Sequence, residues 1–206
     1  MSQEDRGVRR VDRRVRRSRR AIIEAFDRLI MEEPLERITV SRLAREADVD
    51  RKTVYQHFGS IDGLLDAIAE EAVSELLDKV EDATRERVES GGDVTTLRAF
   101  FGALADHLSE NVVLDQRYCE HVPADLLLAH LARPLIRQIV DRGFVSGELA
   151  AGELEPLLVF ELGGLFALYR WWLLSGSAVP LPELTARACL LAERGVAPLL
   201  GERDAT

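Results

Sequence analysis

The fold is decided by residues 38–68, which read ITVSRLAREADVDRKTVYQHFGSIDGLLDAI. The pattern predicts two short helices joined by a tight turn at residues 47–50, the second helix covering residues 51–58. Val54 and Phe58 are four positions apart and therefore share one face of that second helix. The segment is typical of a helix-turn-helix, which presents its second helix to the major groove of DNA.

Polar residues mark where each short helix begins. Thr39 and Asp50 stand where a side chain can accept the free backbone N–H groups of a following helix. The inward face of the first short helix is predicted to be Leu43, Ala44 and Ala47. Both helices therefore have a start signal and an apolar side to bury.

Helical periodicity extends on both sides of this segment, and no alternating strand or internal repeat is found. An amphipathic helix is predicted over residues 15–32 and ends at Pro34. A long helix begins at Ser60 and ends at Ser90-Gly91-Gly92. Further helices are expected from Leu97 to Leu108, from Pro123 to Gly143 with a kink at Pro134, at residues 154–175 and at residues 182–200, with a less regular stretch around Tyr118, Cys119 and His121. The fold class is therefore expected to be all-α.

The charge is unevenly distributed along the chain. The 206 residues are 47% hydrophobic and carry a net charge of −9, a composition that favours a folded domain over disorder. Residues 1–60 contain 15 Lys and Arg against 11 Asp and Glu, whereas residues 61–206 contain 12 against 25. We therefore expect only the N-terminal part to contact a polyanion.

Several classes of protein are not indicated. Cys119 and Cys189 form neither a disulfide framework nor a metal-ligand pattern, so no metal and no cofactor is expected. No uncharged apolar run reaches the length of a membrane helix, and the Arg-rich start lacks the apolar core of a secretory signal. No nucleophile elbow, phosphate-binding loop or dinucleotide fingerprint occurs, so no catalytic residue is assigned. These features favour a cytoplasmic protein that is not an enzyme.

The second helix of the motif also carries a family resemblance. The core Thr53-Val54-Tyr55-Gln56-His57-Phe58, followed by Leu64-Leu65, resembles the DNA-binding domain of TetR-type (TetR/AcrR) transcriptional regulators. The resemblance covers roughly residues 15–70. Beyond it, the helical layout and the aromatic tail LFALYRWWLLSG at residues 165–176 are similar to the family's ligand-binding and dimerisation domain.

The outward side chains of this helix suit phosphates and base edges, with Arg or Lys matching guanine and Gln matching adenine. With the resemblance added, the expected DNA-binding residues are Thr39, Ser41, Arg42, Arg51, Lys52, Thr53, Tyr55, Gln56 and His57. The chain departs from the family pattern at two positions. Asp48 replaces the usual turn Gly. Asp is tolerated at this position because it adopts the left-handed backbone conformation more readily than most residues. Ile61 replaces a phosphate-binding Lys.

The resemblance implies three parts: an Arg-rich arm at residues 1–14, a helix-turn-helix domain at residues 15–60, and a helical ligand-binding and dimerisation domain at residues 61–206. We expect a repressor that binds a pseudo-palindromic double-stranded DNA operator as a homodimer and is released by a small-molecule effector. The alternative is an all-α enzyme or small-molecule carrier with a vestigial DNA-binding head. The arm either contacts DNA or is a solvated tail.

Nine of the twelve aromatic residues lie between Phe100 and Trp172, which suggests an apolar pocket. Its expected wall and polar anchors are Phe100, Phe101, Tyr118, Phe166, Tyr169, Trp172, His107, Arg117 and His121. Residues 154–175 are apolar on two sides: Leu158, Leu162, Leu165, Tyr169 and Trp172 form one stripe, and Phe160, Gly164, Ala167 and Trp171 form another. A helix of this kind is buried on both sides, either wholly in the core or partly in a subunit interface shared with Leu184, Ala188, Leu191 and Gly195.

Overall fold

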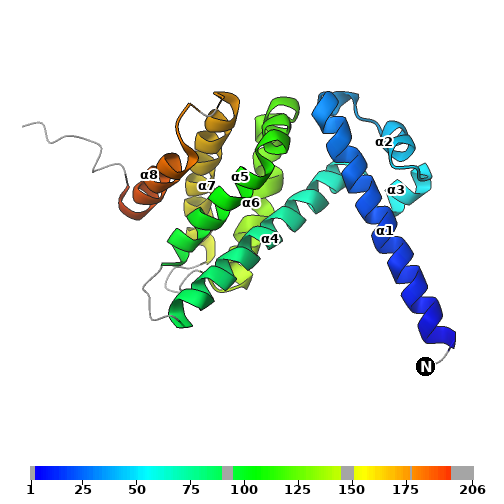
Figure 1. Ribbon diagram of the computed structural model, residues 1–206, viewed down its shortest axis with the longest axis horizontal. Helices are drawn as coiled ribbons and strands as arrows, with labels where there is room; N and C mark the ends of the chain where they lie inside the picture. Colours follow the sequence, from blue (N-terminus) through cyan, green and yellow to red (C-terminus); the bar gives the residue numbers. More distant parts are fainter. Residues whose placement is uncertain (1–2, 90–94, 145–150, 177, 196–206) are drawn as a thin grey trace, which may run out of the picture.

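The chain is described by a computed structural model that places the backbone of residues 3–89, 95–144, 151–176 and 178–195 (Figure 1). Every regular element in these ranges is helical, which confirms the predicted fold class. The elements are α1 (Gln3–Glu32), the 3-10 turn η1 (Leu35–Arg37), α2 (Val40–Glu46), α3 (Arg51–Phe58), α4 (Ile61–Glu89), α5 (Thr96–His121), α6 (Ala124–Asp141), α7 (Ala151–Leu174) and α8 (Leu181–Arg194).

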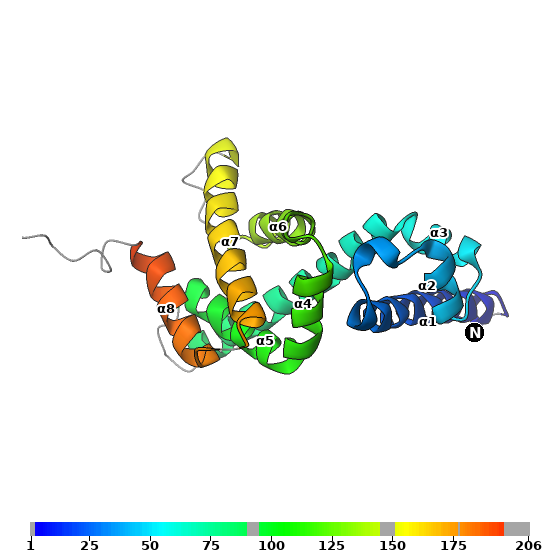
Figure 2. The same ribbon diagram turned by 90° about the horizontal axis from the view of Figure 1, so that it is seen from above.

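Helices α1, α2 and α3 form a head at one end of the molecule (Figures 1 and 2). The Thr39 hydroxyl accepts the backbone N–H of Arg42 at 3.2 Å and so caps α2 as predicted. Asp50 does precede α3, but its side chain makes no capping hydrogen bond. Asp48 lies in the turn at φ 52°, the left-handed conformation expected for the residue that replaces the family's Gly. Thr39 therefore marks the start of α2, and the left-handed Asp48 forms the turn that leads to α3.

The joint between α3 and α4 depends on two glycines. Gly59 ends α3 at φ 74°, a conformation that L side chains rarely adopt. A Cβ on Gly63 would lie 2.1 Å from the carbonyl oxygen of Phe58, so no larger residue fits there without moving backbone. The Ser60 hydroxyl accepts the N–H of Gly63 at 2.9 Å. The head is thus held closely against the start of α4.

Helix α4 runs from the head into a bundle formed with α5, α6, α7 and α8 (Figure 2). Near the head, one continuous core joins fully buried Phe26 of α1, Val54 of α3 and Leu64 of α4 to Leu108 and Tyr169 of the bundle. A second core, centred on Val73, Leu77 and Val80 of α4, lies deeper in the bundle. Head and bundle are therefore packed on one another rather than tethered by a linker.

Three helices differ from their predicted bounds. Helix α1 begins at Gln3 instead of near residue 15, because apolar periodicity marks only the buried part of a helix and Arg favours helix even where nothing is buried. Helix α5 continues to His121 through the stretch predicted to be less regular. Helix α8 ends at Arg194, where Gly195 at φ 65° closes it, and the remainder of the predicted 182–200 helix lies outside the described residues.

Helix α7 is the most apolar helix, and it packs on α5 and α6 by one side. By length and composition its segment Leu154–Leu174 would suffice to cross a membrane, with mean hydropathy 1.5 and 17% of it buried. The segment contains charged residues, whereas the sequence-based prediction considered only apolar runs without any charge. Its predicted inner stripe turns inward, with Tyr169 and Trp172 buried, while Phe160 is 74% exposed.

Candidate DNA interface and ligand cavity

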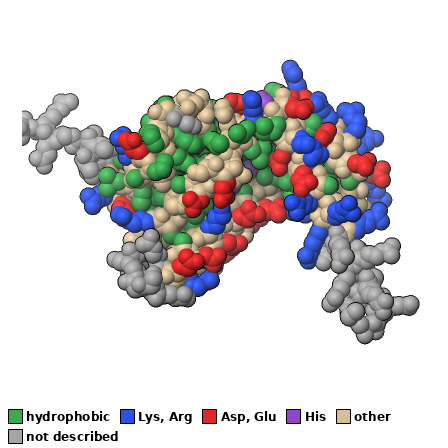
Figure 3. Space-filling model, in the orientation of Figure 1, with side chains coloured by type: hydrophobic (Ala, Val, Ile, Leu, Met, Phe, Trp, Pro, Cys, Tyr) green, Lys and Arg blue, Asp and Glu red, His purple; other side chains and the backbone are tan. Residues whose placement is uncertain are grey.

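The outward side of α3 is exposed in the head. Buried Val54 fixes the rotation of the helix, and Arg51, Lys52, Tyr55 and Gln56 project into solvent, with Tyr55 55% exposed. Together with Asp50 they border one shallow depression. Lys and Arg side chains gather around the head in Figure 3, whereas Asp and Glu are frequent along the bundle. The surface has the charge and the side chains that DNA recognition requires.

The structure places His57 differently from the other α3 residues. Its Nε2 lies 2.8 Å from the hydroxyl of Ser18 in α1, and its ring is half-buried against Phe58. Burial lowers the pKa of His57, and the nearby Arg19 lowers it further, so the ring is neutral at pH 7. Its geometry is that of a contact between α3 and α1. Thr53 is also half-buried.

The predicted residues of α2 are tied to neighbours. Arg51 donates a 3.2 Å hydrogen bond to the hydroxyl of Ser41, which joins α3 to α2. Arg42 pairs at 2.7 Å with the carboxylate of Glu33, a residue only 8% exposed. Thr39 is occupied as the cap of α2. The contact between Arg51 and Ser41 helps to hold α3 against α2. The roles of these residues in DNA binding stay predictions.

Two features of α1 and α4 complete this surface. Ile61, at the position of the family's Lys, is half-buried and packs against the core of the head, so it offers no charge to a phosphate. Arg14, Arg17 and Arg20 of α1 are exposed. The Arg-rich segment is therefore part of α1, which begins at Gln3. The side chains of residues 1–13 lie outside the described residues.

A cavity of about 500 Å³ lies in the bundle where α4, α5, α6 and α7 meet, and α1 closes one end of it. Five of the residues predicted for a ligand pocket line it: Phe100, His107, Tyr118, Phe166 and Tyr169. Most of the wall is aliphatic, as expected for a pocket that holds a small apolar molecule.

The other four predicted pocket residues lie elsewhere. Phe101 is buried on another side of α5, edge-on to Phe100, and Arg117 pairs with Glu120 on the surface of that helix. His121 contacts the carbonyl of Ile30 at the base of the head. The Trp172 indole donates to the carbonyl of Val179 at 2.8 Å and anchors the link to α8. Helical phase decides each case, since neighbouring residues of one helix point in different directions.

The sequence prediction missed most of the polar wall. Asp27, Asp115, His130 and Arg170 all border the cavity. His130 is 6% exposed, and its Nδ1 lies 2.7 Å from a carboxylate oxygen of Asp66 in α4. An available signal was the break in apolar periodicity around residue 115, because polar residues that face a cavity interrupt the stripe that faces the core.

Two carboxylates in the cavity wall are strongly affected by burial. Burial raises the pKa of Asp115 to about 7. Burial also raises the pKa of Asp27, although the hydrogen bond from Tyr118 opposes the rise. The pKa of Tyr118 is raised well above its ordinary value, first by burial and then by Asp27, so its hydroxyl stays protonated and donates.

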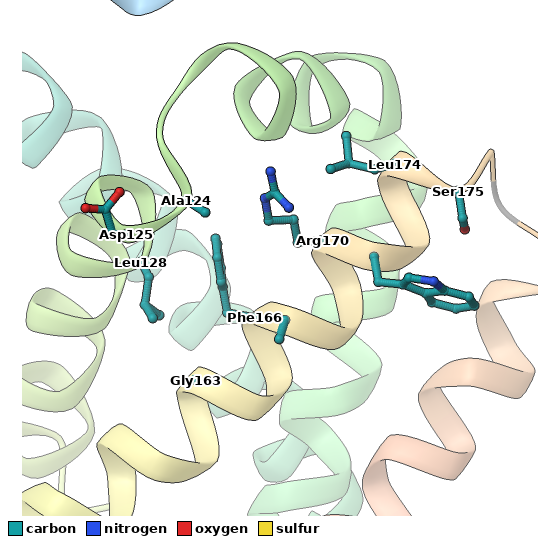
Figure 4. A pocket seen from close by; sticks show the side chains of 10 residues that line it. Ala124, Asp125, Leu128, Gly163, Phe166, Arg170, Leu174 and Ser175 are labelled. Carbon is teal, nitrogen blue, oxygen red and sulfur yellow. The ribbon is translucent and has the colours of Figure 1, made fainter.

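An open groove of about 550 Å³ runs along α7 and shares Leu128, Phe166 and Arg170 with the cavity wall. In Figure 4, Phe166, Arg170 and Leu174 project from α7 toward Ala124 and its neighbours at the start of α6. The groove also includes Ala167 and Trp171 of the predicted second stripe. It is therefore continuous with the exposed apolar side of α7.

Neither cysteine is in a disulfide: Cys119 is buried and Cys189 half-buried. Within the part of the chain that the structure describes, no three His, Cys, Asp or Glu side chains are grouped closely enough to hold a metal ion.

Comparison with known proteins places the head in a family. Residues 22–68 match the family model for bacterial regulatory proteins of the tetR family. A TetR transcriptional regulator from Streptococcus agalactiae 2603V is similar in structure, with a TM-score of 0.62, 21% identity, and coverage of 91% of this chain and 99% of that one. The fatty acid degradation regulator FadR from Bacillus halodurans gives 0.55, 19%, 87% and 96%. Comparison with curated proteins gives no match. At these identities the likeness is one of fold.

Proposed function

We propose that this chain, whose residues 22–68 carry the DNA-binding domain of the tetR family, is a cytoplasmic repressor that a small molecule releases from its operator. The observation that carries the proposal is α3, where Arg51, Lys52, Tyr55 and Gln56 are exposed on a helix that buried Val54 holds in place. Arg, Lys and Gln read base edges, and a Tyr hydroxyl binds phosphate. The proposal assigns the protein no catalytic step.

The working form is proposed to be a homodimer joined along α7. Large apolar side chains on its outer side are exposed, namely Leu157 (53%), Phe160 (74%) and Trp171 (50%). Gly163 and Gly164 lie between them and have open space where a Cβ would stand, so a second helix could approach closely. A continuous exposed apolar surface of this kind indicates an interface. Two copies joined here would present two heads to two operator half-sites about 34 Å apart.

The stripe on α8 belongs elsewhere. Leu184 and Ala188 are 6% and 4% exposed and face α5 within the same chain. Their burial makes the predicted contribution of this stripe to a subunit interface wrong for these two residues. The proposed interface therefore rests on α7.

The cavity is proposed to hold the effector. A ligand can shift the protein only through different affinities for two conformations, so its site must contact an element that differs between them. The cavity meets this condition because Asp27 of α1 and Leu65 of α4 line it together with residues of the bundle.

The test is the binding of the purified protein to the promoter next to its own gene, measured by fluorescence anisotropy against random DNA of equal length at fixed salt. The proposal expects low-micromolar or tighter binding that random DNA competes poorly. Equal affinity for both DNAs contradicts it and favours the alternative of an enzyme or carrier with a vestigial head.

A further inference from the structure

The cavity contains polar atoms that the protein does not satisfy. Among the described residues, four buried side-chain nitrogen or oxygen atoms lack a hydrogen-bond partner, and those of Asp115, His130 and Arg170 belong to the cavity wall. The Nε2 of His130 still lies 3.1 Å from a carboxylate oxygen of Asp62. The two that remain are Oδ2 of Asp115 and Nε of Arg170. A buried polar group without a partner is costly, so both atoms indicate a ligand.

The carboxylate of Asp115 has no counter-ion. Its nearest basic group is His107, whose Nε2 lies 3.7 Å from Oδ2, beyond hydrogen-bond distance. Burial lowers the pKa of His107, and the charge of Lys79 lowers it further, so this ring is neutral at pH 7. Asp115 therefore faces the cavity without a positive partner from the protein.

The charge of Arg170 is partly offset by a helix end. Its Nη2 donates at 3.3 Å to the carbonyl of Cys119 in the last turn of α5. The carbonyl end of a helix carries negative partial charge, which stabilises a cation there. The Nε–H of Arg170 is left for an acceptor group on the ligand.

The wall as a whole is acidic. The titratable groups that line the cavity together with Asp115 are Asp27 of α1, Glu71 and Glu75 of α4, His107, Tyr118 and Cys119 of α5, His130 of α6 and Arg170 of α7. Glu71 is paired with Arg19, Glu75 is exposed to solvent, and Asp27 accepts from Tyr118, which leaves Asp115 as the wall carboxylate with a buried oxygen that has no partner.

We infer that the effector is an apolar amine whose ammonium group pairs with Asp115 while its body fills the aliphatic part of the cavity. This inference rests on the proposed function, because it takes the cavity to be the effector site. A volume of about 500 Å³ suits a molecule with one or two rings or a short alkyl chain. The ammonium supplies the positive partner that Asp115 lacks and donates to the free Oδ2.

Burial keeps part of Asp115 protonated near neutral pH, since its pKa is about 7. An alkylammonium stays charged up to about pH 10. Amine binding should therefore strengthen by about tenfold between pH 6 and pH 8, as the carboxylate ionises, and level off above that.

The test uses three probes with one phenylbutyl body: phenylbutylamine, phenylbutanol and phenylpentanoate, which carry a cationic, a neutral and an anionic head. Binding of each to the full-length protein is measured by isothermal titration calorimetry at pH 6 and pH 8. The variant Asp115→Asn keeps the shape of the side chain and removes its charge. The control Asp106→Asn alters an exposed carboxylate of the same helix.

Phenylbutylamine should bind most tightly at pH 8. Asp115→Asn should weaken it by about tenfold or more and abolish its pH dependence, while phenylbutanol binds this variant as before and shows that the cavity is intact. Asp106→Asn should behave as wild type. If Asp115→Asn does not fold, the pH dependence of the wild type decides.

Tightest binding of phenylpentanoate overturns the inference and assigns the cavity to carboxylic acids at Arg170. Equal binding of all three probes, no binding of any, or an unchanged amine affinity in Asp115→Asn overturns it too. Operator affinity is measured separately with each probe. An amine that binds but leaves operator affinity unchanged contradicts the proposed regulation and leaves the ligand class standing.

Discussion

The hydroxyl of Tyr118 in α5 donates a 2.7 Å hydrogen bond to the carboxylate of Asp27 in α1. Both residues line the cavity, and Asp27 belongs to the helix that carries the head. Because the raised pKa of Tyr118 keeps its hydroxyl protonated, this bond persists at neutral pH. A ligand that competes for either partner therefore acts directly on the junction between bundle and head.

Removing this bond should weaken both stability and regulation. Tyr118→Phe leaves the half-buried Asp27 without its donor, so the free energy of unfolding should fall by about 1–3 kcal/mol in urea titrations. The variant should also show a smaller effect of effector on operator affinity. Thr185→Val is the matched control, because it removes the 3.1 Å hydrogen bond with the Tyr169 hydroxyl within the bundle at a residue that does not line the cavity. An effector response equal in the two variants contradicts the role of the junction.

Stability should depend on Asp115 in a defined pH range. A carboxyl whose folded pKa of about 7 exceeds its ordinary value of 3.8 stabilises the fold at low pH, and this contribution is lost as pH rises through 7. Asp115→Asn removes the penalty, so it should exceed wild type in unfolding free energy at pH 8 by up to about 4 kcal/mol and converge with it near pH 4. Chemical denaturation across this range measures the difference. A constant difference across the range contradicts the assignment.

DNA reading should depend on the exposed side of α3. The triple variant Arg51→Ala, Lys52→Ala, Tyr55→Phe should fold and lose operator binding, because all three side chains lie outside the core. Lys52→Ala alone should relax preference at particular bases by about 1–3 kcal/mol if it pairs with guanine. Arg133→Ala in α6 is the control for a lost surface cation. Unchanged operator affinity in a folded triple variant would sink the DNA-binding assignment.

The dimer should depend on the outer side of α7. Ala167 is exposed, so Ala167→Asp should leave the subunit folded and give monomers in light scattering, because a charge in a packed interface must be desolvated. Ala188 is 4% exposed, so Ala188→Asp should instead destabilise the subunit itself. Val140→Asp, at an exposed position of α6, should stay dimeric. A wild type that is monomeric at tens of micromolar refutes the interface.

The Arg-rich start of α1 should add salt-dependent affinity. Each phosphate that it neutralises steepens the fall of log affinity with log salt by about 0.9. Deleting residues 1–14 should leave folding and dimerisation intact, weaken operator binding and flatten this slope. The measurement is operator affinity at several salt concentrations for both proteins. Equal affinities on parallel lines mean that the segment is a solvated tail.

The sequence-based predictions were most accurate where the conformation of a residue depends on its near neighbours in the chain. Thr39 as a cap, Asp48 in the left-handed turn and Val54 on the buried side of α3 all follow from nearby residues and are found as expected. The two-sided character of α7 also follows from its periodicity. These features need no knowledge of which helices meet.

It predicted least where helices from distant parts of the chain converge. Asp27 and Tyr118 are separated by 91 positions, and no local pattern shows that they touch. The predicted pocket wall included both Phe100 and Phe101, whereas helical phase turns only Phe100 to the cavity. The His57 ring makes its hydrogen-bond contact with Ser18, a residue of another helix. Tertiary contacts of this kind require the arrangement of α1, α4 and α5.

Helix α4 contributes residues to both hydrophobic cores, so a tilt of this helix would move its two ends by different distances. Its deep core around Leu77 is a natural pivot, and Ile61 at the head lies 16 residues away, about 24 Å along a straight helix. A tilt of about 8° at the pivot would displace the head by about 3.4 Å, one base-pair step of DNA. The wall of the cavity at Ile68 would move by only about 2 Å over the same tilt. In the proposed dimer, a molecule that fits the cavity would therefore move each head out of register with its half-site while displacing the cavity wall at Ile68 by only about 2 Å.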